Sequence, residues 1–315
     1  MDLLLRLSAR IALAGATVVF VSIFVFVAMR LGPVDPAILL AGDTASEEDV
    51  AAIRRSLGLG QSWLTQYLRW AGLIFTGEFG RSIYSGRPVL EMIGQRVEPT
   101  ALIAAATLAV SAAAGAGFGL FAALHRGRFV DRAVMAGSVI GFSVPVFVLG
   151  YGLILVFSMG LGWFPVQGYT SFENDPSRAL RSLVLPVATL TPVYLSIIAR
   201  ITRASALEIV RADHVRTAIA KGLGPLPVAF RHVLLNASLP IVTAIGAGFA
   251  MLIGGTVVTE TVFSIPGIGR LLVDAVLRRD YPTIQGIILI LSGIYILVNL
   301  AVDLAYVVID PRVKL

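Results

Sequence analysis

Six long apolar stretches constrain this chain more than any other feature of its sequence. They are Ile11–Met29, Thr100–Leu124, Ala133–Phe172, Ser182–Ala199, Asn236–Thr259 and Tyr281–Val302. A bilayer core of about 30 Å needs roughly 20 apolar helical residues, so each stretch can cross a membrane or nearly so. We end the third helix near Gly160, because Trp163-Phe164-Pro165 is typical of an interfacial aromatic belt with a helix breaker. The sequence therefore predicts an all-α membrane protein with six transmembrane helices.

The composition agrees with membrane insertion. Of the 315 residues, 57% are hydrophobic and only 14% are charged, whereas a soluble domain carries about 25% charged residues. A large soluble α/β protein would lack the polar residues that its surface needs. The chain has no cysteine, which excludes a disulfide framework and a thiolate metal site. The first apolar stretch is longer than a signal-peptide core and no Ala-x-Ala site follows it, so we interpret it as a retained anchor.

Positive charge predicts which ends of the spans face the cytoplasm. If the N-terminus lies inside, the cytoplasmic segments are 1–10, 125–132, 200–235 and 310–315. These segments hold 13 Arg and Lys against 5 Asp and Glu, whereas the outer segments hold 12 against 13. The outer segments are 30–99, 161–181 and 260–280. Because cytoplasmic loops are enriched in Arg and Lys, we expect both termini to be cytoplasmic.

We divide the chain into residues 1–99, an anchor helix with a large outer segment, and residues 100–315, a five-helix core. In the outer segment, Ser46-Glu47-Glu48-Asp49 fits a capping box at the start of a short helix. Apolar residues at helical spacing follow it, namely Val50, Ile53 and Leu57, and Gly58 and Gly60 end the helix. A second amphipathic helix is predicted around Trp63–Phe75. Two interpretations stay open: the segment packs on the outer helix ends, or it is a docking surface or lid.

The segment from Asp213 to Pro240 interrupts the apolar pattern on the predicted cytoplasmic side. We expect the preceding helix to continue to Gly222 with an apolar stripe of Leu207, Val210, Val215, Ala218 and Ile219. A second helix follows Pro225 and Pro227, with a stripe of Leu226, Phe230, Val233, Leu234 and Ala237. Two short helices around a glycine break form a rigid, charged element. It is either a rigid lever that transmits force from a separate, energy-supplying protein, or a solvated loop that is basic only because cytoplasmic loops are enriched in Arg and Lys.

Catalytic motifs are missing from the sequence. The only lysines are Lys221 and Lys314, and neither belongs to a phosphate-binding Walker A loop. The three histidines, His125, His214 and His232, have no metal-ligand spacing. A Gly-x-Ser-x-Gly nucleophile elbow is also missing. We therefore predict a protein that is not an enzyme and that holds no catalytic residue, metal or cofactor of its own.

Several motifs together resemble one known family, the inner-membrane permease subunits of ABC importers of the dipeptide and oligopeptide type. The spacing of Arg216–Gly222 is similar to the family's cytoplasmic Glu-Ala-Ala-x-x-x-Gly loop, with Arg-Thr in place of Glu-Ala, and Leu239-Pro240 resembles its closing Leu-Pro. Other matches cover nearly the whole chain: Gly77–Ser82, Gly86–Val89, Leu161–Pro165, Gly168-Tyr169, Ala199–Ser205, Glu260–Leu272, Arg279–Pro282 and Asp310–Arg312. Gly32–Pro36 departs from the family's Pro-Gly-Asp-Pro.

The resemblance implies a type I ABC importer transmembrane-domain fold in the bacterial inner membrane. It implies four kinds of partner: a homologous second permease, two ATPase subunits that bind ATP and Mg²⁺, a periplasmic binding protein and a peptide substrate. Nucleic acid is not expected as a partner. The residues implied in ATPase coupling, within a loop at 204–236, are Asp213, His214, Val215, Arg216, Thr217, Ala218, Lys221 and Gly222.

Candidates for the translocation pathway or an outer gate are Ser143, Met251, Gly255, Glu260, Phe263, Pro266 and Asp280. Glu260, at the outer end of the fifth span, is either a gate residue or an interfacial carboxylate paired with a nearby arginine. The turn after it is either an ordinary connector or a segment that dips into a pore mouth. The small residues of Ala112–Gly119 and Ile245–Gly255 indicate close helix packing or, alternatively, a hinge.

Two alternative functions remain open. Related importers carry nickel chelates, glutathione or sugars, so the substrate class is open even within the family. A secondary carrier that works alone would need ionisable groups near mid-membrane and usually internal repeats, and the sequence shows neither.

Overall fold

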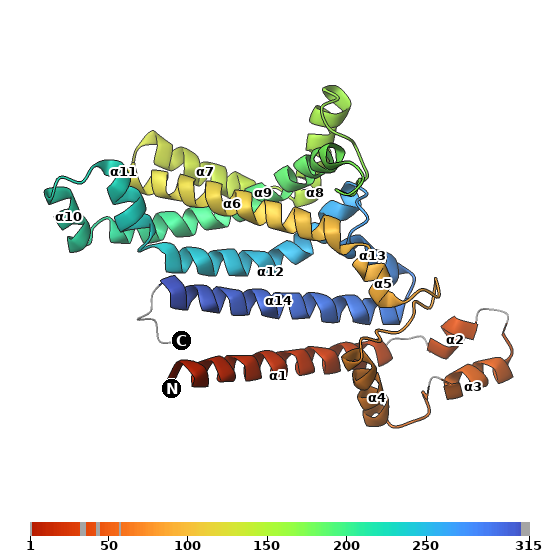
Figure 1. The fold of residues 1–315 in the computed structure, drawn as a ribbon. Helices are drawn as coiled ribbons and strands as arrows, with labels where there is room; N and C mark the ends of the chain where they lie inside the picture. Colours follow the sequence, from red (N-terminus) through yellow and green to blue (C-terminus); the bar gives the residue numbers. More distant parts are fainter. Residues whose placement is uncertain (1, 32–35, 42–44, 57, 310–315) are drawn as a thin grey trace. The chain divides into compact units, whose positions relative to one another are not determined.

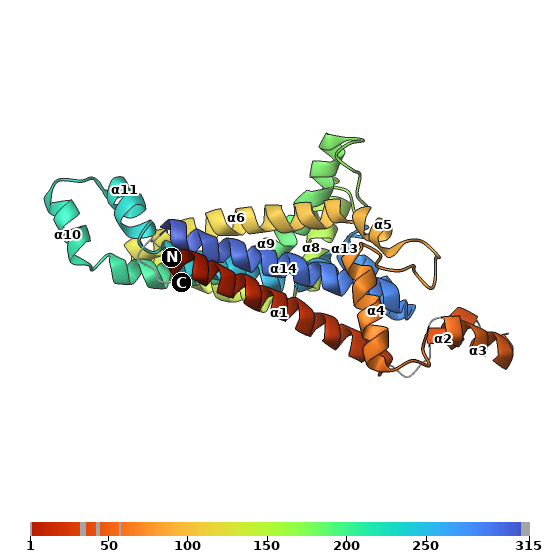
Figure 2. The same ribbon diagram turned by 60° about the horizontal axis from the view of Figure 1, so that its bottom comes forward.

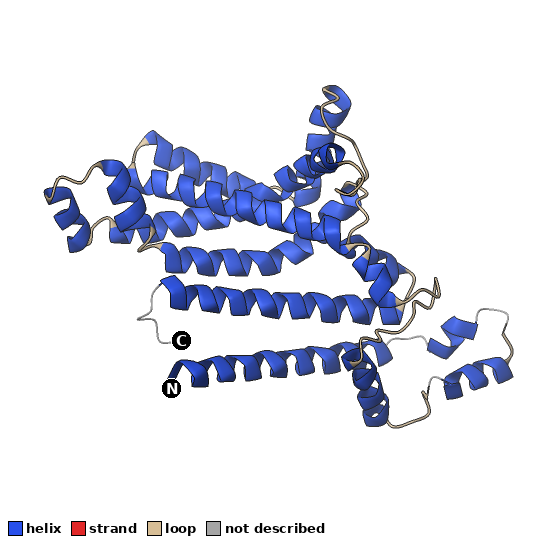
Figure 3. Ribbon diagram, in the orientation of Figure 1, coloured by secondary structure: helices blue, strands red, loops and turns tan. Residues whose placement is uncertain are grey.

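The computed structural model describes residues 2–31, 36–41, 45–56 and 58–309, and Figure 1 shows its fold. Three parts of the predicted motifs, at 32–35, 57 and 310–312, lie outside these residues. Figure 3 shows that the described residues are helical or in loops. An isolated bridge joins Arg81 to Pro88. The helices, with π-helical segments marked η, are α1 (Asp2–Arg30), α2 (Pro36–Ala41), α3 (Glu47–Ser56), α4 (Trp63–Phe75), α5 (Val89–Gly94), α6 (Val97–Leu124), α7 (Phe129–Ser143), α8 (Val146–Leu153), η1 (Ile154–Gly160), α9 (Pro176–Ile209), α10 (Asp213–Ala220), α11 (Pro225–Pro227), η2 (Val228–Leu234), α12 (Ser238–Val262), α13 (Ile268–Leu277) and α14 (Tyr281–Ile309).

The predicted six spans correspond to five single helices and one bent pair. By length and composition, α1, α6, α9, α12 and α14 can each cross a membrane. The third span is the pair Phe129–Ser143 and Val146–Gly160, which meet at 98°. Val144 is extended, as residues before a proline tend to be, and Pro145 has no N–H to continue the helix. The end at Gly160 is as predicted, but the single helix expected from Ala133 is broken at this proline.

The fourth span is longer than the predicted Ser182–Ala199, because α9 begins at Pro176 and ends at Ile209. Asp175 caps its start by accepting the Arg178 backbone N–H at 3.0 Å. The helix contains Pro186 and Pro192. Hydroxyl groups near the two prolines donate to carbonyls of the same helix, as where Ser196 Oγ donates to Pro192 O.

Contacts divide the chain into two compact units. The first consists of Met1–Val97 with Leu271–Ile296, and the second of Glu98–Arg270 with Leu297–Leu315. In the first unit, α4 packs on the end of α1 through the rings of Phe26, Tyr67 and Trp70, whose centroids lie 5.4–6.1 Å apart. Ser22 and Tyr67 hydroxyls also hydrogen bond at 2.8 Å. These contacts support the interpretation that the outer helix packs on a span end.

The predicted capping box is confirmed at the start of α3. The Asp49 backbone N–H donates to Ser46 Oγ at 3.2 Å, and the Ser46 backbone N–H donates to the Asp49 carboxylate at 3.1 Å. Hydrogen bonds from Ser46 hold the pKa of Asp49 below its usual value. The hydrogen bond from the Ser46 side chain has the larger effect and that from the Ser46 backbone the smaller one.

Close helix packing defines the second unit, where α9 contacts both α7 and α12. A Cβ atom on Gly119 of α6 would lie 2.4 Å from the Ala199 carbonyl oxygen of α9, and one on Gly246 of α12 would lie 2.8 Å from Val302 of α14. At Gly255, a Cβ would lie 2.8 Å from the Tyr194 hydroxyl oxygen. The glycines of both small-residue stretches therefore allow close approach.

Candidate functional site

The loop between α9 and α12 forms a compact element beyond the ends of α6 and α9, as both ribbon views show (Figures 1 and 2). Val215 and Ala218 of α10 are buried at 1% and 5% exposure. They belong to one apolar cluster with parts of α6, α9 and η2, namely Leu120, Ala123, Ala206, Val228, Ala229 and Val233. The prediction of a rigid pair of short helices is thus matched by a packed core inside the loop. We call α10, α11 and η2 together the loop element.

The first helix of the loop element is separate from the preceding span, contrary to the prediction of one helix continuing to Gly222. Helix α9 ends at Ile209, and α10 begins at Asp213 after an extended Ala212. The Ala212 backbone N–H closes a turn on the Ile209 carbonyl at 2.9 Å. This break lets α10 turn back so that Val215 reaches the common core. The sequence carries no proline or glycine here, so no local signal marked the break.

Gly222 ends α10 where the sequence predicted a break. Its φ of +82° lies in the left-handed region, where a side chain with a Cβ is strained. The backbone N–H groups of Gly222 and Leu223 donate to the carbonyls of Ile219 and Ala218. The backbone conformation therefore favours glycine at this position. This explains why the predicted Arg216–Gly222 motif ends in glycine.

The predicted apolar face of the second helix is confirmed only in its second half. Val233 and Ala237 are buried and Leu234 packs on the core as expected, but Leu226 and Phe230 are 69% and 56% exposed, and Val228 and Ala229 are buried instead. The segment Val228–Leu234 is π-helical, and the Leu235 N–H bonds back five residues to Phe230 O. The wider helical turn shifts the register, so α-helical periodicity selects the wrong residues at the start of this segment, Leu226 and Phe230.

The exposed surface of the loop element is both charged and apolar. Of the predicted coupling residues, Asp213, His214, Arg216, Thr217 and Lys221 are exposed. The Asp213–Arg216 ion pair, at 3.7 Å, is too exposed to contribute much stability. Ile219 is 57% exposed beside them. Leu226 and Phe230, which were expected to be buried, are further exposed apolar side chains of the loop element. We call Ile219, Leu226 and Phe230 the apolar tip.

At the other end of the second unit, Glu260 organises the turn that follows α12. Its side chain is fully buried, and its carboxylate accepts the Thr100 hydroxyl at 2.6 Å and the Arg270 backbone N–H at 2.9 Å. The Thr100 hydroxyl oxygen in turn accepts the Ile268 N–H at 2.8 Å. Because backbone donors from beyond the turn converge on this pair, Glu260 fixes the path of the chain into α13.

Glycine is required on the inner side of this turn. A Cβ atom on Gly267 would lie 2.1–2.4 Å from the carboxylate atoms of Glu260, and one on Gly269 would lie 2.7 Å from the Val257 Cα. Ser264 has a φ of +50°. The turn is therefore built around the buried carboxylate, and its glycines leave room for that group.

A second carboxylate anchors the neighbouring segment 161–175. Glu98, in the first turn of α6, accepts the Tyr169 hydroxyl, the Ser171 hydroxyl and the Phe172 N–H at 2.8–3.0 Å. Burial raises the pKa of Tyr169, and the hydrogen bond to Glu98 raises it further. The Tyr169 hydroxyl therefore stays protonated and remains a donor. The Gly168 N–H donates to the Phe263 carbonyl at 2.9 Å. Glu98 and Glu260 thus hold two loops on the start of α6, an arrangement that sequence spacing alone did not reveal.

The other predicted pathway residues do not share one site. Phe263 and Pro266 lie on the Glu260 turn, and Phe263 is buried. Ser143 lies at the bend before Pro145, Met251 is exposed on α12, and Gly255 packs against Tyr194. Asp280 belongs to the first compact unit, where its carboxylate accepts the Ser82 hydroxyl, the Ile83 N–H and the Thr283 hydroxyl.

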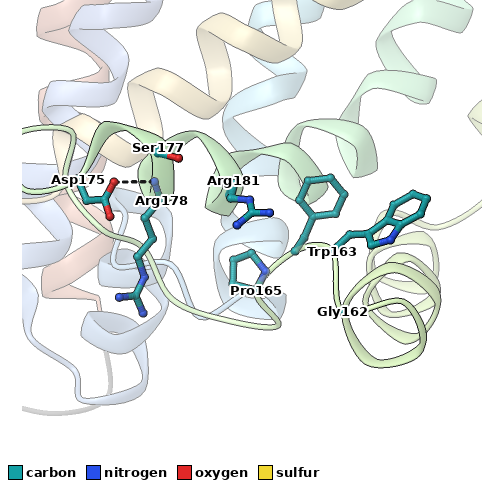
Figure 4. A pocket seen from close by; sticks show the side chains of 8 residues that line it. Gly162, Trp163, Pro165, Asp175, Ser177, Arg178 and Arg181 are labelled. Carbon is teal, nitrogen blue, oxygen red and sulfur yellow. Dashed lines mark hydrogen bonds between the residues drawn. The ribbon is translucent and has the colours of Figure 1, made fainter.

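A cavity of about 430 Å³ lies between the aromatic segment after η1 and the start of α9, as Figure 4 shows. Trp163 and Pro165 line one wall and Arg178 and Arg181 another, with Asp175 at the helix cap. The Trp163 ring packs 5.7 Å from that of Phe157. Within the described part of the chain, no group of three His, Asp or Glu side chains could hold a metal ion.

The second unit is thus a helical bundle with a packed loop element at one end and loops fixed by carboxylates at the other. The chain is similar in sequence to known membrane transport proteins. The family described as the inner membrane component of binding-protein-dependent transport systems matches residues 115–315, and its N-terminal counterpart matches residues 3–104. The chain therefore belongs to this family of ABC transporter permeases, as its motifs predicted.

Individual relatives match along nearly their whole length. A probable peptide ABC transporter permease of Sinorhizobium fredii is 50% identical over 95% of this chain and 96% of its own. A putative peptide transport system permease of Brucella abortus is 40% identical over 97% of each chain. A glutathione transport system permease of Salmonella typhi is 40% identical over 95% of each chain.

The fold is also similar to a solved structure. An inward-facing structure of the MetNI methionine ABC transporter matches with a TM-score of 0.57 and 19% identity, covering 70% of this chain and 96% of that one. The predicted type I importer fold is thus confirmed.

Proposed function

We propose that this chain forms one half of the pathway of an ATP-driven peptide importer in the bacterial inner membrane, with both termini in the cytoplasm. A homologous second permease forms the other half. Two separate ATPase subunits bind ATP and Mg²⁺, and a periplasmic binding protein delivers the peptide. Family membership and the relatives named as peptide permeases support this proposal.

The observation that carries the coupling role is the construction of the loop element. Its apolar tip is exposed, while Val215 and Ala218, on the same short helix as Ile219, belong to a core shared with α6 and α9. A force applied to the tip therefore passes through packed side chains to two spans, because packed cores resist deformation. A solvated loop without such a core could not transmit it.

In this mechanism, ATP binding closes the ATPase pair and moves the loop element as one body. The ends of α6 and α9 follow, and the far ends of the spans open towards the binding protein. Coupling of this kind is reciprocal in binding free energy, so delivery of a loaded binding protein also favours ATP binding.

Substitution of Gly222 tests the proposal. Gly222→Val places a β-branched side chain at a φ of +82° and should distort the turn that ends α10. We expect membrane insertion at the normal level, with peptide uptake reduced at least tenfold while the ATPase remains active. Gly224→Val is the matched control, because Gly224 has a φ of −66° and its Cβ would meet only Pro227 at 3.9 Å. Normal uptake by the Gly222 variant would contradict the coupling role.

Glutathione is a second candidate substrate, because a glutathione permease is 40% identical over 95% of both chains. Uptake of labelled di- and oligopeptides, glutathione, a nickel chelate and a sugar should be compared in a deletion strain with and without this chain. Peptide uptake restored by the chain supports the first proposal. Restoration of glutathione uptake alone would replace peptide by glutathione.

A further inference from the structure

A second cavity, of about 630 Å³, lies entirely within the first compact unit. Its walls come from the C-terminal end of α1, from Leu59 and Trp70, from the segment 80–86 and from the first two turns of α14. Apolar atoms dominate the lining, which includes Met29, Leu59, Trp70 and Pro282. Its size and apolar walls are those of a ligand pocket, in which a few polar groups fix the orientation of the ligand.

Two arginines supply positive charge to this cavity. The Arg30 guanidinium stacks 3.7 Å over the Phe26 ring, and its Nε donates to Gln66 Oε1 at 2.9 Å, which leaves the terminal N–H groups available. Arg81 uses Nη1 to donate to the Gly86 carbonyl at 3.0 Å. No Asp or Glu lines the cavity, and in the described part of the chain neither arginine has an ion-pair partner. The nearby Asp280 carboxylate is buried and engaged by three donors.

The third polar group is Gln285, in the second turn of α14. It is only 8% exposed and lines the cavity, and its carboxamide makes no hydrogen bond with any residue that the structure describes. A ligand oxygen in the cavity would accept a hydrogen bond from its N–H₂ group. The unpaired Gln285 side chain therefore indicates a binding site independently of the two arginines.

The position of the cavity indicates the ligand. Arg30 is the last residue of the candidate span Ala12–Arg30, and Tyr281 is the first residue of Tyr281–Tyr306. The cavity therefore lies at a membrane boundary, the depth at which Trp and Tyr, here Trp70 and Tyr281, are enriched. An anion found at this depth and attached to an apolar chain is a phospholipid.

We propose that this cavity binds the headgroup of an anionic phospholipid of the outer leaflet. Arg30 and Arg81 hold the phosphate, and Gln285 donates to a headgroup or glycerol oxygen. The apolar wall around Met29 and Trp70 takes the beginning of an acyl chain. A bound lipid would join the ends of α1 and α14 within the first unit and stabilise the packing between them.

Trp70 can report on this site in nanodiscs. The protein is prepared with Trp63→Phe and Trp163→Phe, so that Trp70 is the sole tryptophan, and brominated phosphatidylglycerol or brominated phosphatidylcholine is titrated into the discs. Quenching by phosphatidylglycerol should saturate at a several-fold lower mole fraction. Arg81→Gln should weaken the phosphatidylglycerol affinity about fivefold, since one basic residue near a membrane surface contributes about 1 kcal/mol. Gln285→Leu should also weaken it, with an unchanged melting temperature.

Arg178→Gln is the control, because Arg178 lines the separate cavity of Figure 4 beside Asp175. It should leave the phosphatidylglycerol titration unchanged. Equal quenching by both lipids in the unsubstituted protein, or equal effects of Arg81→Gln and Arg178→Gln, would overturn the proposal. Reversal of the quenching by millimolar inorganic phosphate would assign the site to a free anion instead of a lipid.

Discussion

Glu260 shows how one side chain can hold a whole turn. Its carboxylate accepts hydrogen bonds from Thr100 and from the Arg270 backbone, and Gly267 packs directly on it. The sequence placed this residue at the end of the fifth span but could not show these partners. Thr100 is 160 residues away, and spacing within one helix carries no information about contacts between helices.

Glu260→Gln tests the role of this carboxylate. An amide keeps the volume but offers one acceptor oxygen and a donor that faces other donors, so at least one buried hydrogen bond is lost. We expect a loss of about 1–3 kcal/mol in the free energy of unfolding, measured as a lower melting temperature in detergent. Glu173→Gln, an exposed carboxylate on the neighbouring loop, should leave the melting temperature unchanged. Equal melting of the Glu260 variant and the parent would show that the charge is not needed.

At the level of helices, spans were more predictable than their internal geometry. Each span is an uninterrupted apolar run, and run length determines whether a helix can cross a bilayer. The bend at Pro145 and the π-helical turn at Val228–Leu234 were not anticipated, because a helical wheel assumes one period and one axis. Gly222 was predicted correctly, since a left-handed turn favours glycine through local backbone sterics alone.

An ion pair joins α7 to α9 and offers a test at this level. Arg203 donates to both carboxylate oxygens of Asp131, which is 4% exposed and also accepts the Gly127 N–H at 2.9 Å. Removing one partner leaves the other without its hydrogen bonds, and because the Arg203 side chain is 26% exposed and partly solvated, Asp131→Ala should cost about 1.5–3 kcal/mol. The double variant Asp131→Ala/Arg203→Ala should cost less than the two single losses added together. Additive losses in thermal unfolding would show that the two residues do not interact.

For the whole molecule, the distribution of positive charge predicts that the loop element faces the cytoplasm. The sequence has no cysteine, so single cysteines can report the topology directly. With only the outer membrane permeabilised, a membrane-impermeant maleimide should label Glu173→Cys, and should label Lys221→Cys only after cell lysis. Both residues are exposed in the structure. Labelling in the reverse order would invert the proposed orientation.

The proposed coupling mechanism depends most on a separate ATPase subunit that binds the loop element. A photoreactive amino acid at Ile219, which is 57% exposed at the apolar tip, tests this contact directly in the assembled transporter. We predict that illumination links this position to an ATP-binding subunit, and that the same probe at exposed Glu173 does not form this link. If the probe at Ile219 gives no link to an ATP-binding subunit while peptide uptake is intact, the coupling role of the loop element is contradicted.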